Sequence, residues 1–224
     1  MTWDVRKFES IDSTNTWLLE RAREGAPQGL VAVADHQTAG RGRLGRRWEA
    51  PPGANLLCSI LLRPPSVSWL SVARVSLAAL AAAPPDTGLK WPNDIVHGPD
   101  SLKLAGVLAE VEGGAVVVGI GMNVGWAPPD LPATSLAALG VSSSRDEVLA
   151  TLLESLTHWV AASDAEVARA YRERCVTIGR QVRVELPDET FEGTAADVAD
   201  SGHLLVETSV CLREVSAGDV VHLR

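Results

Sequence analysis

An arginine-rich loop is the most chemically suggestive stretch of this sequence. Residues 38–48 read TAGRGRLGRRW, which places four arginines and three glycines in front of Trp48. Arginine recognises carboxylates and phosphates through paired hydrogen bonds, and glycine lets a backbone approach a ligand closely. The tryptophan adds a flat face for a purine or another ring. The stretch therefore predicts an anion-binding loop, although a solvated arginine-rich loop would have the same composition.

Two common phosphate-binding motifs do not account for this loop. Gly40, Gly42 and Gly45 have the spacing of the dinucleotide fingerprint, which requires a helix to open at the third glycine. The paired prolines Pro51 and Pro52 follow too closely for such a helix. A Walker A loop is excluded as well, because two arginines stand where its Lys-Ser/Thr pair is required.

A second group of polar residues follows in two short segments. Residues 90–94 read KWPND, in which Pro92 is expected to stiffen a strand-like segment and fix the directions of the flanking polar side chains. Residues 102–106 read LKLAG, and Lys103 is one of only three lysines among 20 basic residues. A surface turn with a lysine–aspartate pair is the plainer interpretation. Beside a cationic loop, the cluster resembles a phosphoryl- or nucleotidyl-transfer site.

The sequence GIGMNVG at 119–125 places Asn123 in a glycine-flanked turn. Glycines at such a position often only permit a tight turn. The functional alternative is that they leave room for a nucleotide ring beside the asparagine.

Length and composition limit the class of protein. The 224 residues suit one large domain, or a main domain with a small appendage, and 46% hydrophobic residues can form a substantial core. The formal net charge of −8 argues against a general nucleic-acid binder. No apolar run approaches the length of a membrane span and no signal core opens the chain, so a cytoplasmic protein is expected. Cys58, Cys175 and Cys211 form no CxxC pair and are expected to be buried, reduced thiols.

Strands and helices are predicted to alternate along the chain. Apolar periodicity with flanking Ser, Gly and Pro predicts helices at 13–25, 68–83, 145–161 and 164–174. Strand-rich segments are predicted at 30–35, 55–64, 88–97, 102–112 and 114–125, with a hairpin at Gly113-Gly114. After residue 175 five short alternating runs predict a small barrel, with a boundary near residue 176. This last part contains none of the motifs described above.

The motifs together resemble the biotin protein ligase family. They are STN at 13–15, HQTAGRGRLGRRW at 36–48, KWPND at 90–94, KLAG at 103–106 and GIGMNV at 119–124. The stretch GTAADVADSGHLLVE at 193–207 resembles that family's C-terminal barrel. The resemblance implies an α/β (α+β) fold, with a mixed-sheet catalytic domain at 1–175 and an SH3-like barrel at 176–224. Because STN begins at residue 13, we expect the ligase-only form, which lacks the winged helix-turn-helix of larger bacterial members. We therefore expect no sequence-specific DNA binding.

The resemblance also implies a two-step reaction and a set of site residues. Biotin and ATP, with Mg²⁺ held through the ATP phosphates, would give biotinyl-5′-AMP, and the biotinyl group would pass to a lysine of the biotin carboxyl carrier protein of acetyl-CoA carboxylase or a related carboxylase. The implied catalytic residues are Arg43, Lys103 and Asp94, of which the aspartate is only assigned to line the site. The implied biotin-binding residues are Ser13, Thr14, Asn15, Gln37, Gly40, Arg41, Gly42, Arg43, Lys103 and Gly106. The implied ATP-binding residues are Arg43, Arg46, Trp48, Lys90, Asn93, Lys103 and Asn123.

Several alternatives stay open at this point. A lipoate–protein ligase would share the fold and the adenylate chemistry, but the GRGR and KWPND segments favour the biotin enzymes. An inactive adenylate sensor, a transcriptional repressor and a nucleotide hydrolase fit the motifs less well. The turn HGPDS at 97–101 is slightly longer than in some relatives. The sequence does not decide whether the barrel contacts ATP or the carrier, or whether the protein forms a homodimer.

Overall fold

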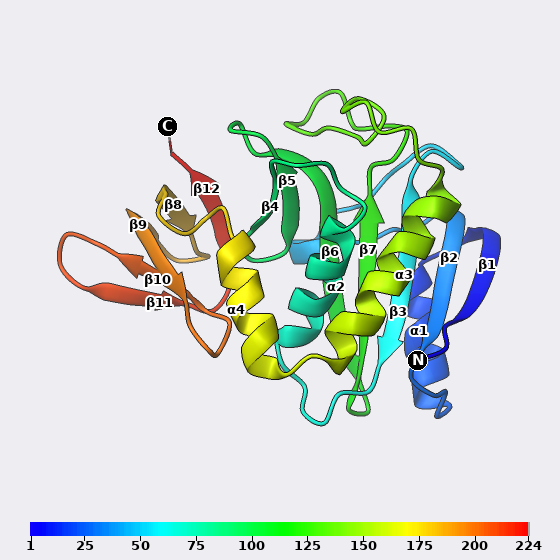
Figure 1. Cartoon of the computed structure of the whole chain (residues 1–224). Helices are drawn as coiled ribbons and strands as arrows, with labels where there is room; N and C mark the ends of the chain where they lie inside the picture. The colour runs from blue at the N-terminus through cyan, green and yellow to red at the C-terminus, as the bar shows by residue number, and fades with distance from the viewer. Residues whose placement is uncertain (224) are drawn as a thin grey trace.

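A seven-stranded mixed sheet forms the centre of the molecule. The computed structural model describes residues 1–223, and its strands in this sheet are β1 (Asp4–Ile11), β2 (Leu30–Gln37), β3 (Leu56–Leu62), β4 (Thr87–Lys90), β5 (Asp94–His97), β6 (Leu102–Glu112) and β7 (Ala115–Met122). Their spatial order is β1-β2-β3-β7-β6-β5-β4 (Figure 1). The β1–β2 pair is parallel and the other pairs are antiparallel. The interior strand β3 is buried along its whole length, as expected for a strand covered on both faces.

Helices cover both faces of this sheet. The helix α1 (Thr14–Arg23) packs Leu18 against Leu61 and Val117 on one face. On the other face, α2 (Leu70–Leu80), α3 (Arg145–Ala161) and α4 (Asp164–Arg174) enclose the larger hydrophobic core (Figure 1). Among the described residues, no helix is both long and apolar enough to cross a membrane.

The last part of the chain forms a second, five-stranded sheet. Its strands are β8 (Gln181–Glu185), β9 (Thr190–Val198), β10 (Leu204–Glu207), β11 (Leu212–Val215) and β12 (Asp219–His222). They are antiparallel throughout, in the order β11-β10-β9-β8-β12. Buried Val182 and Val184 alternate with exposed neighbours in β8, the pattern of a strand with one face on a core. The predicted α/β architecture with a small C-terminal β unit is confirmed, while the boundary near residue 176 stays a prediction.

The small sheet is docked closely on the rest of the protein. The backbone N–H of Val176 donates to Leu89 of β4 at 2.9 Å. The indole N–H of Trp91 donates to the carbonyl of Gly202 at 2.9 Å, and Arg172 of α4 donates to the carbonyl of Val198 at 2.6 Å. These contacts join the segment before β8 to β4, the β9–β10 turn to the β4–β5 turn, and the end of β9 to α4. The small sheet therefore has a fixed position beside the large one (Figure 1).

Most of the predicted elements are present. The predicted N-cap of the first helix is Ser13, whose Oγ accepts from Thr16 N at 3.4 Å, and the predicted hairpin turns at Gly113-Gly114, where both φ angles are positive.

Three features differ from the prediction. The prediction that KWPND is strand-like is wrong for its centre, because Trp91–Asn93 form the turn between β4 and β5. Cys211 is exposed rather than buried, since it lies in the β10–β11 turn. Strand β1 was not predicted.

Candidate active site

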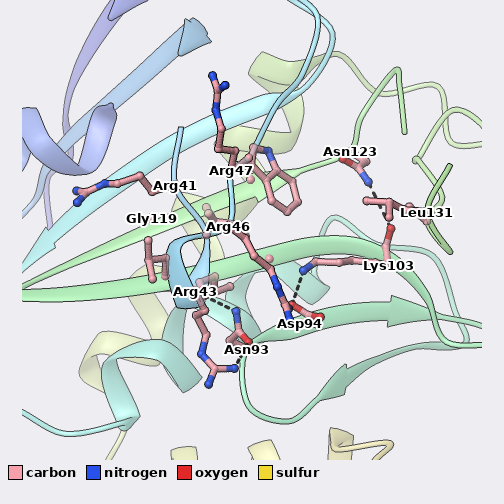
Figure 2. Close-up of a pocket in the computed structure, with 18 of the residues that line it drawn as sticks. Arg41, Arg43, Arg46, Arg47, Asn93, Asp94, Lys103, Gly119, Asn123 and Leu131 are labelled. Carbon is pink, nitrogen blue, oxygen red and sulfur yellow. Dashed lines mark hydrogen bonds and ion pairs between the residues drawn. The ribbon is translucent and has the colours of Figure 1, made fainter. Parts of the chain in front are cut away.

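A cavity of about 1060 Å³ opens where the arginine loop faces strands β5, β6 and β7. Every residue predicted for the site lines it except Gly40. The carbonyl of Gly40 instead accepts from Trp48 N at 3.0 Å at the base of the loop, and a Cβ there would meet the carbonyl of Trp48. Motifs separated by more than 100 residues in the sequence, from Ser13 to Asn123, therefore converge on one space. Figure 2 shows the part of it around the arginine loop, Asn93, Lys103 and Asn123.

Backbone hydrogen bonds shape the arginine loop into a narrow hairpin. Gly42 N donates to Arg46 O at 2.7 Å, and Arg46 N donates to Arg43 O at 3.1 Å. At the tip, Leu44 and Gly45 have φ angles of 56° and 73°, a left-handed conformation that glycine adopts without strain. The Leu44 side chain is 68% exposed, so the tip itself is not packed into the core.

The four arginines of the loop point in different directions (Figure 2). Arg43 donates to Asn93 Oδ1 at 3.1 Å, and Arg46 pairs with the carboxylate of Asp219 in β12. Arg41 points the other way and pairs with Glu110 Oε2 of β6 at 2.9 Å. Arg43 and Arg46 thus face Asn93 and the C-terminal sheet, while Arg41 faces β6.

An ion pair lies opposite the loop. Lys103, the second residue of β6, places its Nζ 2.7 Å from Asp94 Oδ1 at the start of β5, because these two strands are neighbours in the sheet (Figure 2). The ammonium also lies 5.5 Å from the centroid of the Trp48 ring. A Cβ added to Gly106 would lie 3.3 Å from Lys103 Nζ, so the glycine leaves the space that this ammonium uses. The predicted lysine–aspartate pair is present and belongs to the cavity wall.

Partial burial weakens the hydration of the cations in the cavity. Burial lowers the pKa of Arg43, against the raising effect of Asp219 and Asp94. Burial also lowers the pKa of Lys90, and Lys103 lowers it further, against the raising effects of Asp94 and Asp219. Less hydrated cations interact more strongly with an incoming anion. The cavity is therefore suited to a ligand with several negative charges.

Buried polar side chains at the start of α1 form a connected network in the wall of the cavity. Gln37 Oε1 accepts from Thr14 N at 2.7 Å and from Thr14 Oγ1 at 2.9 Å. Ser59 of β3 lies 2.6 Å from Thr14 Oγ1 and donates to Asn15 Oδ1 at 2.6 Å. Asn15 Nδ2 in turn donates to Glu110 Oε2 at 2.8 Å. A neutral head group rich in donors and acceptors could exchange hydrogen bonds with such a network without a change in charge.

Two glycines of the sheet seat the tryptophan that ends the loop. A Cβ on Gly121 would come 2.3 Å from Trp48 Cε2, and one on Gly106 would come 3.0 Å from the same ring. The ring therefore packs directly on the backbone of β6 and β7, which fixes its plane.

Asn123, which follows β7, is 2% exposed and donates through Nδ2 to Thr134 O at 3.0 Å. Its Oδ1 accepts from Asn55 at 3.1 Å, so its amide already joins β3 to the loop that follows β7.

Comparison with known proteins decides the family. Residues 7–126, more than half of the chain, match the biotin/lipoate A/B protein ligase family. The chain belongs to this family. Residues 177–223 also match the biotin protein ligase C-terminal domain.

The relatives cover nearly the whole chain. A biotin–[acetyl-CoA-carboxylase] ligase from Mycobacterium tuberculosis is 45% identical over 95% of this chain and 86% of its own length. A protein of the same name from Paracoccus denitrificans is 29% identical over 93% of this chain and 96% of its own. Among solved structures, a biotin protein ligase from Aquifex aeolicus in complex with biotin and ATP has a TM-score of 0.81 and 29% identity, covering 99% of each chain.

Some cavity residues of this family member were not predicted. They are polar or acidic residues that come from other elements: Ser59, Glu185 and Asp219. Asn55 and Glu110 do not line the cavity, but they hydrogen-bond to its lining residues Asn123 and Asn15. Ser59 and Glu110 lie inside runs that read as ordinary strands, and only the strand pairing brings them to the site. Asp219 carried a weak signal, because the β12 strand begins with a carboxylate directly after the turn Ala217-Gly218. The C-terminal sheet, which contains none of the motifs implied to bind biotin or ATP, thus supplies part of the cavity wall.

Proposed function

We propose that this protein is a biotin protein ligase, which activates biotin with ATP and transfers the biotinyl group to a lysine of a carrier protein. The observation that supports this most strongly is the convergence of Arg43, Arg46, Lys90 and Lys103 on one cavity, beside the neutral network around Thr14. A cavity with a cationic half and a neutral polar half matches a substrate pair that consists of a triphosphate and a carboxylate with a ureido head.

In the first step, a biotin carboxylate oxygen attacks the α-phosphorus of ATP. The new bond is an acyl–phosphate bond, the bond to the β-phosphate oxygen breaks, and pyrophosphate leaves. No proton has to move, so the main barrier is the repulsion between two anions, which fixed cations offset. We assign Lys103 to the position between the two reacting groups, and Arg43 and Arg46 to the phosphates. Asp94, at 2.7 Å from Lys103, holds that ammonium in place.

Biotin and adenine are assigned to the two ends of the cavity. The ureido group would exchange hydrogen bonds with Ser13, Thr14, Asn15 and Gln37, at the end where α1 begins. The adenine would pack on Trp48, whose plane is fixed by the glycines beneath it, and lie next to Asn123. Since the amide of Asn123 is already hydrogen-bonded within the protein, its contribution would be to shape the pocket and to offer the remaining lone pair of Oδ1.

In the second step, the neutral amine of a carrier lysine attacks the acyl carbon of the adenylate. The acyl–phosphate bond breaks, AMP leaves, and the amine releases a proton to the solvent. The relatives named as acetyl-CoA-carboxylase ligases support the carrier domain of that enzyme as the acceptor, and a cytoplasmic location is part of the proposal.

Magnesium is assigned to the nucleotide rather than to a protein cage. Among residues 1–223 there is no group of three or more His, Cys, Asp or Glu side chains that could hold a metal ion. Magnesium binds commonly through substrate phosphates with few protein ligands. When bound with ATP, it would add positive charge at the phosphates, and the arginines and lysines of the cavity perform the remaining neutralisation.

One assay tests this proposal against a lipoate ligase. The purified protein is incubated with ATP, Mg²⁺ and either biotin or lipoate, and the acyl-adenylate is measured by mass spectrometry. We expect biotinyl-5′-AMP and, after addition of the carrier domain, one biotinyl group on a single lysine. Formation of lipoyl-AMP in preference to biotinyl-AMP would overturn the assignment in favour of a lipoate ligase.

A further inference from the structure

A carboxylate of the C-terminal sheet contacts the arginine loop in the wall of the cavity. Asp219, the first residue of β12, pairs through both oxygens with Arg46, with an Nη1–Oδ1 distance of 3.4 Å for one of the two contacts. Its neighbour Gly218 accepts a hydrogen bond from Arg43 Nη2 at 3.4 Å. The Asp219 side chain is only 28% exposed. Two arginines of one loop thus contact two consecutive residues, the last of a turn and the first of β12, more than 170 positions further along the chain.

The strand end that holds the loop is itself fixed by independent contacts. Asp219 pairs with Glu185 in the β8–β12 ladder. At the other end of β12, His222 contacts Thr177 Oγ1 at 3.0 Å and Ser101 Oγ at 3.3 Å. The arginine loop, by contrast, ends in an exposed Leu44 in a left-handed conformation. The strand is therefore the rigid partner, and the loop is the element that can move relative to it.

A carboxylate at this place is unfavourable for phosphate binding taken by itself. Asp219 lies beside Arg43 and Arg46 in a cavity whose other cations face an incoming anion. Its negative charge opposes that anion and competes for the same guanidinium groups. A role in substrate contact therefore does not explain the residue, whereas a role in placing the arginine does.

We propose that Asp219 is a positioning residue, which holds Arg46 and so keeps the arginine loop closed over the cavity. The inference rests on the proposed function, because the closed loop would retain biotinyl-5′-AMP until the carrier arrives. The C-terminal sheet then contributes to the selectivity of the enzyme through the loop. When the adenylate escapes, any exposed lysine amine can attack its acyl carbon, with release of AMP and of one proton to the solvent.

The test compares Asp219→Asn with a matched control in the same sheet region. Asp200 lies in the β9–β10 turn, is 97% exposed, and pairs with Arg172 of α4 at 2.6 Å. Asp200→Asn therefore removes an ion pair between α4 and the C-terminal sheet without changing a contact of the arginine loop. Asp219→Glu keeps the charge and tests rescue.

The first measurement needs no substrate. Trypsin cleaves after arginine, and cleavage within residues 41–47 reports how often the loop leaves its position. Partly exposed ion pairs contribute little free energy, so we expect cleavage in Asp219→Asn to be about two- to fivefold faster than in wild type. Asp200→Asn and Asp219→Glu should match wild type. Equal cleavage of Asp219→Asn and wild type, or equal acceleration by Asp200→Asn, would overturn the proposal.

The second measurement follows the adenylate. Full-length protein is loaded with ATP, Mg²⁺ and biotin, and the half-life of bound biotinyl-5′-AMP is measured with and without a lysine-rich bystander protein. Asp219→Asn should shorten the half-life about two- to fivefold and raise bystander labelling relative to carrier labelling. In an Arg46→Ala background the same substitution should have no further effect, and an undiminished effect would contradict the assignment. If wild type forms no biotinyl-5′-AMP, the proposed function fails, while the trypsin result still decides the role of Asp219.

Discussion

Replacement of Lys103 by arginine tests whether the site needs a compact ammonium or only a positive charge. The ammonium lies 2.7 Å from Asp94 Oδ1 and 5.5 Å from the centre of the Trp48 ring. A Cβ on Gly106 would lie 3.3 Å from the same nitrogen. An arginine is longer by one atom and ends in a planar fork, so its charge cannot occupy the same point among these neighbours.

The expected loss follows from this crowding. The guanidinium must shift either toward the space assigned to the α-phosphate or away from Asp94. A displacement of about 1 Å in a reacting group costs roughly 100-fold in rate. We therefore expect Lys103→Arg to lower the rate of biotinyl-5′-AMP formation by about 100-fold, close to the effect of Lys103→Ala.

Single-turnover formation of biotinyl-5′-AMP is the appropriate assay, because it isolates the chemical step from product release. The chain offers a matched control in Lys7→Arg, since Lys7 also pairs with an aspartate, Asp146, at 2.7 Å, but on the exposed surface. That variant should keep the wild-type rate. If Lys103→Arg also keeps most of the rate, the charge alone is sufficient and the argument from crowding is wrong.

Three further predictions concern the loop, the biotin end and pH. Arg43→Gly removes the contacts with Asn93 and Gly218, and should weaken retention of biotinyl-5′-AMP by about ten- to several-hundred-fold while the adenylate still forms, as bystander labelling would show. Gly119→Ala places a Cβ 2.3 Å from Asn15 Oδ1, and should raise the KM for biotin about tenfold with a smaller change in kcat. Burial, aided by the nearby ammonium of Lys90, lowers the pKa of His222 from 6.5 to about 4. As the pH falls, the imidazole of His222 is protonated at a higher pH in the unfolded chain than in the folded one. The free energy of unfolding should therefore decrease between about pH 6.5 and pH 4, and His222→Gln should reduce this dependence on pH in denaturant unfolding.

Features set by local interactions could be predicted from the sequence. Ser13 caps α1 because its hydroxyl reaches a backbone N–H three residues on, and Gly113-Gly114 turns a hairpin because both residues adopt positive φ. The Lys103–Asp94 pair was also predictable in part, since two segments separated by one turn often become adjacent strands. In each case the partners lie close together in the sequence.

Features set by distant pairing could not be predicted in this way. Ser59 and Glu110 reach the site only because β3 and β6 lie on either side of β7, and their runs read as ordinary strands. The edge strand β1 was missed because most of its side chains are exposed, which leaves no clear alternation of apolar residues. Asp219 lies in a part of the chain without any motif implied to bind biotin or ATP, and only the docking of the second sheet brings it to Arg46.

The distribution of charge in the cavity explains why an acidic chain contains a cationic loop. The cations of the cavity repel one another, and two of them are held by carboxylates. Asp94 holds Lys103, and Asp219 holds Arg46. The first carboxylate comes from the central sheet and the second from the C-terminal sheet. An incoming triphosphate can then meet arginines and lysines that are already separated and directed, without the cost of gathering them from solution. It follows that the two sheets share one cavity, and that the predicted boundary near residue 176 would not divide the residues that line it.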